Sequence, residues 1–128
     1  MTQAITKGVK ISVNSVFCGI QERNQKKHFL YDYYIVIENL SPNTIQLVSR
    51  YWEIYDSLNY IETVKGEGVI GLQPVLKSGE KHAYKSHCIL HSNCGSMKGY
   101  YSILNLDKKS NFKVEIPKFQ LQTDAILN

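Results

Sequence analysis

A length of 128 residues suits one hydrophobic core, so residues 1–128 are expected to form a single domain. The formal net charge of +4 is modest, and every basic residue except Arg23 and Arg50 is a lysine, so a nucleic-acid-binding surface is not expected. Three cysteines are too few for a disulfide framework. The start of the chain lacks a secretory signal, and no apolar run approaches the roughly 20 residues that cross a bilayer. We therefore expect a cytoplasmic protein with reduced thiols and no membrane partner.

Apolar and polar residues alternate along the first third of the chain, which is typical of half-buried strands. A first strand is expected over residues 9–17. The next strand has Asp32 and Glu38 on its polar face. Its apolar face carries Phe29, Tyr31, Tyr33, Ile35 and Ile37. A turn over residues 39–43 should end it, because Pro42 presets one backbone angle.

A strand over residues 44–55 follows, and its apolar positions change phase. Ile45 and Leu47 are odd-numbered, whereas Trp52 and Ile54 are even-numbered. A β-bulge near residues 49–50 would let all four side chains point inward. We expect Trp52 to be the core indole between two sheets, and the bulge to aim Arg50 in an unusual direction.

The second half of the chain predicts further strands separated by turns. Residues 56–59 form a hairpin connection into a strand over 60–64, and residues 77–80 form another turn. One strand is expected between this turn and residue 90, and another over residues 99–106. A last strand is expected over residues 112–116, after which Pro117 interrupts the ladder. Apolar side chains on single faces support the first and last of these: Tyr84, Cys88, Leu90, Phe112, Val114 and Ile116. Seven or eight antiparallel strands with short turns predict an all-β, two-sheet sandwich.

Residues 66–71 spell the pattern GxGxxG, with glycines at Gly66, Gly68 and Gly71. A dinucleotide-binding loop needs a following helix whose N-terminal amides hold the pyrophosphate. Here Pro74 follows, no helical periodicity is present, and Glu67 would repel a phosphate. The glycines are therefore interpreted as sites of positive φ and bulges in a long connection, with an anion-binding nest of amides as the alternative.

Several ordered blocks of the chain resemble the ApaG family, small bacterial proteins whose domain also recurs in some eukaryotic F-box proteins. The blocks are residues 46–52 (QLVSRYW), 66–74 (GEGVIGLQP), 78–80 (SGE), 95–101 (GSMKGYY) and 116–119 (IPKF). The resemblance covers nearly the whole chain. It implies an immunoglobulin-like or fibronectin-type-III-like β-sandwich, which agrees with the strand pattern.

Histidines and cysteines near residue 90 raise the question of a metal site. His87 and Cys88 point to opposite faces of a strand, so at most His87, His91 and Cys94 could converge. Exposed histidines are the simpler interpretation, and no metal ligand is assigned. A Ser or Cys nucleophile beside an oriented base is not apparent either, so no catalytic residue is assigned.

The resemblance implies a non-enzymatic domain that binds another protein, needs no cofactor and is linked to tolerance of cobalt and magnesium. Two alternatives stay open. In the first, Arg50, Gly66, Gly68 and Gly71 hold a pyrophosphate or nucleotide, and Gly68→Asp would abolish binding without unfolding the domain. In the second, the protein responds to metals directly. Arg50 itself could brace the glycine loop or present a charged fork to a ligand. Edge strands that pair across a two-fold axis predict a homodimer.

Overall fold

The computed structural model describes residues 1–57 and 60–123. Within these residues the chain forms nine strands and no helix, so no helix that could span a membrane is found there. The strands are β1 (Thr2–Thr6), β2 (Val9–Arg23), β3 (Lys26–Asn39), β4 (Ile45–Asp56), β5 (Tyr60–Glu67), β6 (Val75–Leu76), β7 (Lys81–Leu90), β8 (Cys94–Asn105) and β9 (Ser110–Gln122).

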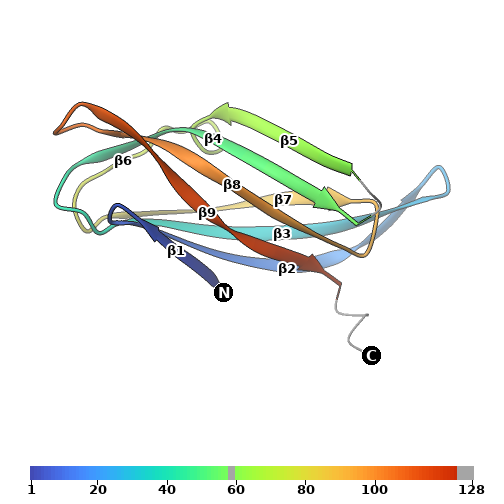
Figure 1. The fold of residues 1–128 in the computed structure, drawn as a ribbon. Coiled ribbons are helices and arrows are strands. Elements are labelled where there is room, and N and C mark those ends of the chain that lie inside the picture. Colours follow the sequence, from blue (N-terminus) through green and yellow to red (C-terminus); the bar gives the residue numbers. More distant parts are fainter. Residues whose placement is uncertain (58–59, 124–128) are drawn as a thin grey trace.

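The strands form two antiparallel sheets that pack face to face (Figure 1). One sheet has the order β1-β2-β3-β7, and the other has the order β5-β4-β8-β9, with the short β6 also paired to β4. On one side of the sandwich β9 lies against β1 and β2, and the Ser15 hydroxyl donates a hydrogen bond across to the Gln120 carbonyl at 2.9 Å. Strands β5 and β7 are the edges on the other side. The two-sheet sandwich predicted from the strand pattern is confirmed.

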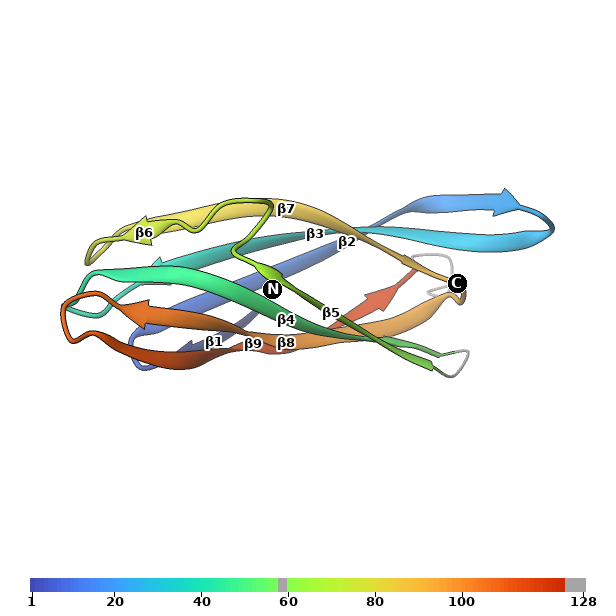
Figure 2. The same cartoon turned by 90° about the horizontal axis from the view of Figure 1, so that it is seen from above.

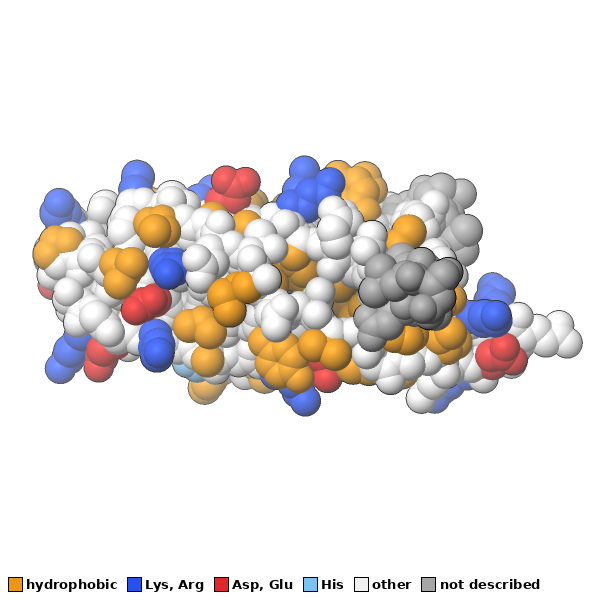
Figure 3. Space-filling view, turned by 90° about the horizontal axis from the view of Figure 1, so that it is seen from below, with side chains coloured by type: hydrophobic (Ala, Val, Ile, Leu, Met, Phe, Trp, Pro, Cys, Tyr) orange, Lys and Arg blue, Asp and Glu red, His pale blue; other side chains and the backbone are white. Residues whose placement is uncertain are grey.

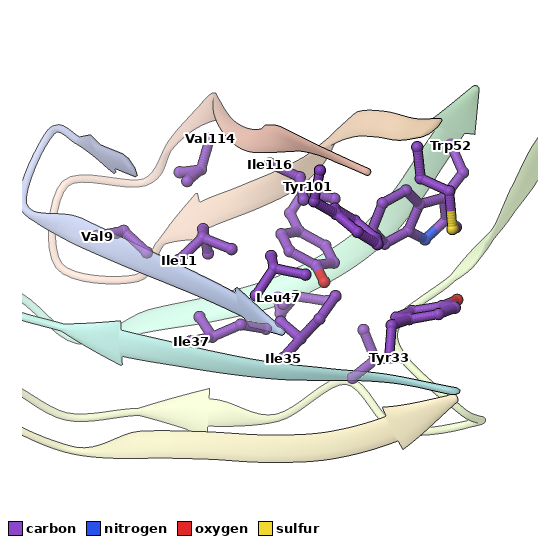
Figure 4. Packing of buried hydrophobic residues seen from close by; sticks show 14 of the residues in the cluster. Val9, Ile11, Tyr33, Ile35, Ile37, Leu47, Trp52, Tyr101, Val114 and Ile116 are labelled. Atoms are coloured by element: carbon purple, nitrogen blue, oxygen red, sulfur yellow. The ribbon is translucent and has the colours of Figure 1, made fainter. Parts of the chain in front are cut away.

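Aromatic and branched side chains fill the space between the sheets (Figure 4). Trp52 is only 2% exposed, and its ring lies 5.5 Å from that of Tyr33 and 6.0 Å from that of Phe119 in edge-to-face arrangements. The predicted inward face of β3 is buried at Tyr31, Tyr33 and its two isoleucines. Trp52 is therefore the core indole that the sequence predicts, and such ring pairs stabilise the core beyond simple burial.

The phase change in β4 has the predicted cause. The register between β4 and β8 shifts between Leu47 and Ser49, one or two positions before the bulge expected from the sequence. Beyond the shift Arg50 pairs with Tyr101 of β8 and with Gly66 of β5. Tyr101 is fully buried, and residues opposite each other in a ladder share a face. The Arg50 side chain therefore leaves its strand on the inner face of the sheet, as expected if a bulge precedes it.

Some elements differ from the prediction. β1 was not expected, and β2 continues past residue 17 to Arg23, where it pairs with β3 in a hairpin that projects beyond the sandwich (Figure 2). The hairpin tip is exposed, so no core contact marks it in the apolar pattern. By contrast, Pro117 interrupts the β8–β9 ladder as predicted: the register shifts beside it, and pairing resumes at Phe119. In the connection predicted for residues 56–59, positions 58–59 lie outside the described residues.

Candidate functional site

Gly66 is a strand residue whose role comes from its neighbour rather than from its backbone angle. It lies opposite Arg50 in the β4–β5 pairing, and a Cβ placed on Gly66 would lie 2.8 Å from the guanidinium carbon of Arg50. Its φ is outside the left-handed region, so the expectation of a positive φ is wrong for Gly66. A glycine is needed here because the guanidinium occupies the space of a side chain.

Gly68 and Gly71 do have the positive φ values predicted for them, +58° and +75°. A Cβ on Gly68 would lie 1.8 Å from the Leu72 carbonyl oxygen, a distance that forbids any side chain. Gly71 follows Ile70, whose φ of +47° is also positive, in a tight turn that joins Val69 to Leu72. Two successive positive angles are the signature of a type I′ turn, which explains the second half of the glycine pattern.

Three backbone amides of the glycine loop bind carbonyl groups of the protein itself. The Gly68 N–H donates to the Val48 carbonyl at 2.7 Å. Val69 and Leu72 exchange hydrogen bonds of 2.8 and 3.0 Å. These donors are therefore not free to form the anion-binding nest considered as an alternative. The loop leads into the short β6 and not into a helix, as the sequence indicates.

Arg50 braces the loop through carbonyl oxygens. Its Nη1 donates to the Glu67 carbonyl at 3.0 Å and to the Gly68 carbonyl at 2.9 Å. This is the first of the two roles expected for Arg50. Gln73, which the sequence analysis did not single out, adds a second brace: its Nε2 donates to the Val48 carbonyl at 2.9 Å.

The four predicted site residues do not all line one pocket. Arg50 and Gly66 line a shallow pocket of about 360 Å³, whereas Gly68 and Gly71 do not. The stacked rings of Tyr51 and Tyr100, with centroids 5.0 Å apart, form another part of its wall. Glu67 and Lys65 line the pocket as well, so a carboxylate and an ammonium group both border it. A Gly68→Asp substitution would place its Cβ against the Leu72 carbonyl, so it would disturb the fold and cannot test ligand binding as expected.

Three tyrosines lie close to Arg50 between the sheets: Tyr33 and Tyr101 are buried, and Tyr84 is partly buried. The hydroxyls of Tyr84 and Tyr101 are 2.5 Å apart. Burial raises the pKa of Tyr33, Tyr84 and Tyr101, and the nearby positive charge of Arg50 only partly opposes this rise. At neutral pH these hydroxyls are therefore protonated, and none is a tyrosinate base or nucleophile.

A buried carboxylate links two loops at the end of the sandwich that carries the projecting hairpin. Asp56 is 6% exposed and accepts a short hydrogen bond from the Ser92 hydroxyl and another from the His91 backbone N–H at 2.7 Å. The Ser57 hydroxyl donates to that of Ser92 at 2.7 Å. Sequence reasoning missed this cluster because its two halves are 35 positions apart. Its geometry ties the end of β4 to the end of β7.

The histidines and cysteines do not converge as a metal site would require. His87 is exposed on β7, while the His91 ring lies 5.1 Å from that of His28. Over residues 1–57 and 60–123 no group of three His, Cys, Asp or Glu side chains could hold a metal ion. The three cysteines are free thiols, and burial raises the pKa of Cys88 to about 12, which makes it a poor nucleophile at neutral pH.

Comparisons with known proteins agree with this architecture. Residues 19–105 match the model of the ApaG domain. Protein ApaG of Brucella abortus is 36% identical over 121 residues, covering 94% of this chain and 92% of that protein. Protein ApaG of Brucella anthropi is 39% identical over the same shares.

Two solved structures are also similar. A protein described as ApaA from Bordetella pertussis has a TM-score of 0.84 and 30% identity, covering 91% of this chain and 94% of its own. A structural-genomics target has a TM-score of 0.88 and 26% identity, covering 93% and 89%. With the family model matching most of the chain, the protein belongs to the ApaG domain family.

Proposed function

We propose that this ApaG-family chain is a cytoplasmic, non-enzymatic domain that binds another protein along its open edge strands. The observation that carries the proposal is the pair of strands β5 and β7, each of which has only one neighbour in its sheet. Unpaired N–H and C=O groups on an edge strand are a template for a strand of another chain. Strand addition of this kind is a recurrent mode of peptide recognition.

Side chains on the two edges support this choice of surface. Ile61 on β5 is 53% exposed, and Ile89 on β7 is 48% exposed. Lys81 and Lys85 are exposed on β7 as well, and edge lysines of this kind discourage indiscriminate pairing. The edges thus combine apolar anchors with charges that would restrict the choice of partner.

The chemistry of the interior supports a binding role over a catalytic one. The buried tyrosine hydroxyls stay protonated at neutral pH, and the Cys88 thiol is held neutral by burial. The amides of the glycine loop and the guanidinium of Arg50 hold backbone carbonyls. Each of these groups has a structural role. Immunoglobulin-like sandwiches lend edges and loops to partners, and we extend that analogy to this chain.

The proposal is tested by capturing partners from a bacterial lysate with the tagged wild-type protein and with charged edge variants. Ile61→Lys and Ile89→Lys should each lose a partner that the wild type retains, because a lysine replaces an apolar anchor on the edge. Tyr34→Lys is the matched control: Tyr34 is 43% exposed but lies on β3, where it is paired with Asn14 of β2 on one side and Lys85 of β7 on the other. Captured partners are then purified and titrated against all four proteins. Equal affinity for wild type and both edge variants would overturn the proposal.

We further propose that the link to cobalt and magnesium implied by the family resemblance acts through the bound partner protein and not through a metal site of this chain. The support is the lack of three converging metal-ligating side chains among the described residues. We expect calorimetric titration of the folded protein with cobalt or magnesium to give no saturable heat. Stoichiometric binding of either ion would return the metal response to this chain.

A further inference from the structure

A second surface, independent of the edge strands, lies at the end of the sandwich opposite the projecting hairpin. Three connections that are distant in sequence meet there: the β1–β2 turn at Lys7, the β3–β4 loop at residues 41–43, and the β8–β9 connection after Asn105. They enclose a pocket of about 400 Å³ whose walls include Ile45 and Phe112. This volume is at the lower end of the range for small-molecule sites. Figure 3 shows several blue Lys and Arg side chains at this left-hand end.

Asn105 presents an unused donor in this pocket. The residue is 9% exposed, and its Oδ1 accepts the backbone N–H groups of Asp107 at 3.1 Å and Lys108 at 3.0 Å. These two bonds fix which end of the amide is oxygen. The Nδ2 group donates no hydrogen bond to any described residue. Nδ2 is not among the enclosed side-chain atoms that lack a partner, so it is accessible at the pocket surface, where a water or a ligand oxygen can accept its hydrogen bond.

Positive charge surrounds the same pocket without a compensating carboxylate. Lys7 and Lys108 both line it, and no Asp or Glu does. The Lys7 ammonium lies 5.6 Å from the centroid of the Phe112 ring. Neither lysine has a salt bridge to a described carboxylate. Asp107, the nearest acidic residue in the sequence, instead accepts the Thr44 backbone N–H at 2.8 Å.

We propose that this pocket binds a small anionic molecule through a phosphate or carboxylate group. The two ammonium groups and the Asn105 amide supply donors only, which suits an oxyanion. The ring of Phe112 and the side chain of Pro42 offer an apolar wall to the rest of the ligand. The site does not depend on the edge strands, so it stands or falls separately from protein binding.

Nuclear magnetic resonance of the full, ¹⁵N-labelled chain tests the site. Inorganic phosphate and acetate are titrated separately at constant ionic strength against chloride. We expect saturable shifts of the Asn105 side-chain NH₂ signals and of the Lys7 and Lys108 amides. Saturation by phosphate alone identifies a phosphoryl ligand, and saturation by acetate alone identifies a carboxylate. Absence of saturation with both anions would overturn the proposal.

Variants separate this pocket from general binding to lysines. Asn105→Asp keeps the Oδ1 acceptor but replaces the donor with a negative charge, so binding should be lost. Lys7→Gln and Lys108→Gln should each weaken binding about threefold, the effect of one solvent-screened charge. Lys109→Gln changes a neighbouring lysine that does not line the pocket and should leave the affinity unchanged. A denaturant titration confirms that each variant is folded. Equal affinities for all four variants and the wild type would also overturn the proposal.

Discussion

Arg50 and Gly66 act as one unit at the scale of single residues. The guanidinium packs where a side chain on residue 66 would lie, and from there it reaches the two carbonyls that begin the loop. Both hydrogen bonds come from a single nitrogen, Nη1, which therefore joins two successive carbonyl groups of the loop. The phosphate-loop pattern is thus produced by three different steric requirements at three glycines.

Alanine substitutions at the three glycines should have unequal effects. Gly68→Ala should be the most destabilising, by about 3 kcal/mol or more, because its Cβ would meet the backbone oxygen of Leu72. Gly66→Ala should cost about 1–3 kcal/mol, because the Arg50 side chain can move but loses its carbonyl contacts. Gly71→Ala should cost about 1–2 kcal/mol from its positive φ alone, since no atom lies within 4 Å of the new Cβ. Urea denaturation of the three variants measures this order.

The double variant Arg50→Ala with Gly66→Ala is the control for that series. Removing the guanidinium first gives the new methyl group room, so the two substitutions should destabilise by less than the sum of the single changes. Strict additivity would show that Gly66 is required for a reason other than Arg50.

Buried thiol and phenol groups predict a loss of stability at alkaline pH. Burial raises the folded-state pKa of Cys88 from 9.0 to about 12 and that of Tyr31 from 10.0 to about 12. The unfolded chain therefore releases these protons first, so the contribution of these two groups to stability is constant below about pH 9 and falls as the pH rises from 9 toward 12. The Cys88 thiol contributes a slope of up to about 1.4 kcal/mol per pH unit between these two pKa values.

Urea denaturation between neutral and alkaline pH measures this decline. In Cys88→Ala the decline should begin near the ordinary pKa of tyrosine, 10.0, and not near that of cysteine, 9.0. In Tyr31→Phe the slope of stability against pH should be smaller above pH 10. A flat stability profile up to pH 11 would contradict the burial of these groups.

Among the elements, strands with an uninterrupted two-residue period were predictable. The apolar faces of β3, β7 and β9 follow from alternation alone, and the phase change in β4 located its bulge to within two residues. β1 was missed because its burial alternates only between exposed and half-buried positions. The outer part of β2 was missed because pairing in the hairpin continues where core contacts have ended.

The candidate sites were less predictable, for reasons of register and distance. The positive φ of Gly68 and Gly71 follows from the residue type, but the role of Gly66 depends on its pairing with Arg50, which the sequence does not specify. The pocket at the loop end joins Lys7 to Lys108 across most of the chain. Only the three-dimensional arrangement of the turns brings such residues together.

The whole molecule has one closed side and one open side. β9 closes the first by lying against β1 and β2, whereas β5 and β7 leave the second unpaired. If no partner is present, the open side can pair with that of a second copy across a two-fold axis. This arrangement would produce the homodimer predicted from the sequence.

Sedimentation equilibrium of the purified protein tests this arrangement. The wild type and Tyr34→Lys should associate to dimers as concentration rises, whereas Ile89→Lys should remain monomeric, because it introduces a charge on the edge strand β7. A wild type that stays monomeric at every concentration would exclude the homodimer while leaving binding of other proteins to be judged by the capture experiment.

The closed side also limits how far such an assembly could extend. A sheet that is open at both ends can add copies without limit and grow into a filament. In this chain β9 packs against β1 and β2, and the Ser15–Gln120 bond joins β2 to β9, so the terminal strands β1 and β9 partly cover each other on the side opposite β5 and β7. Association through the open side therefore uses the available edges and ends at a pair.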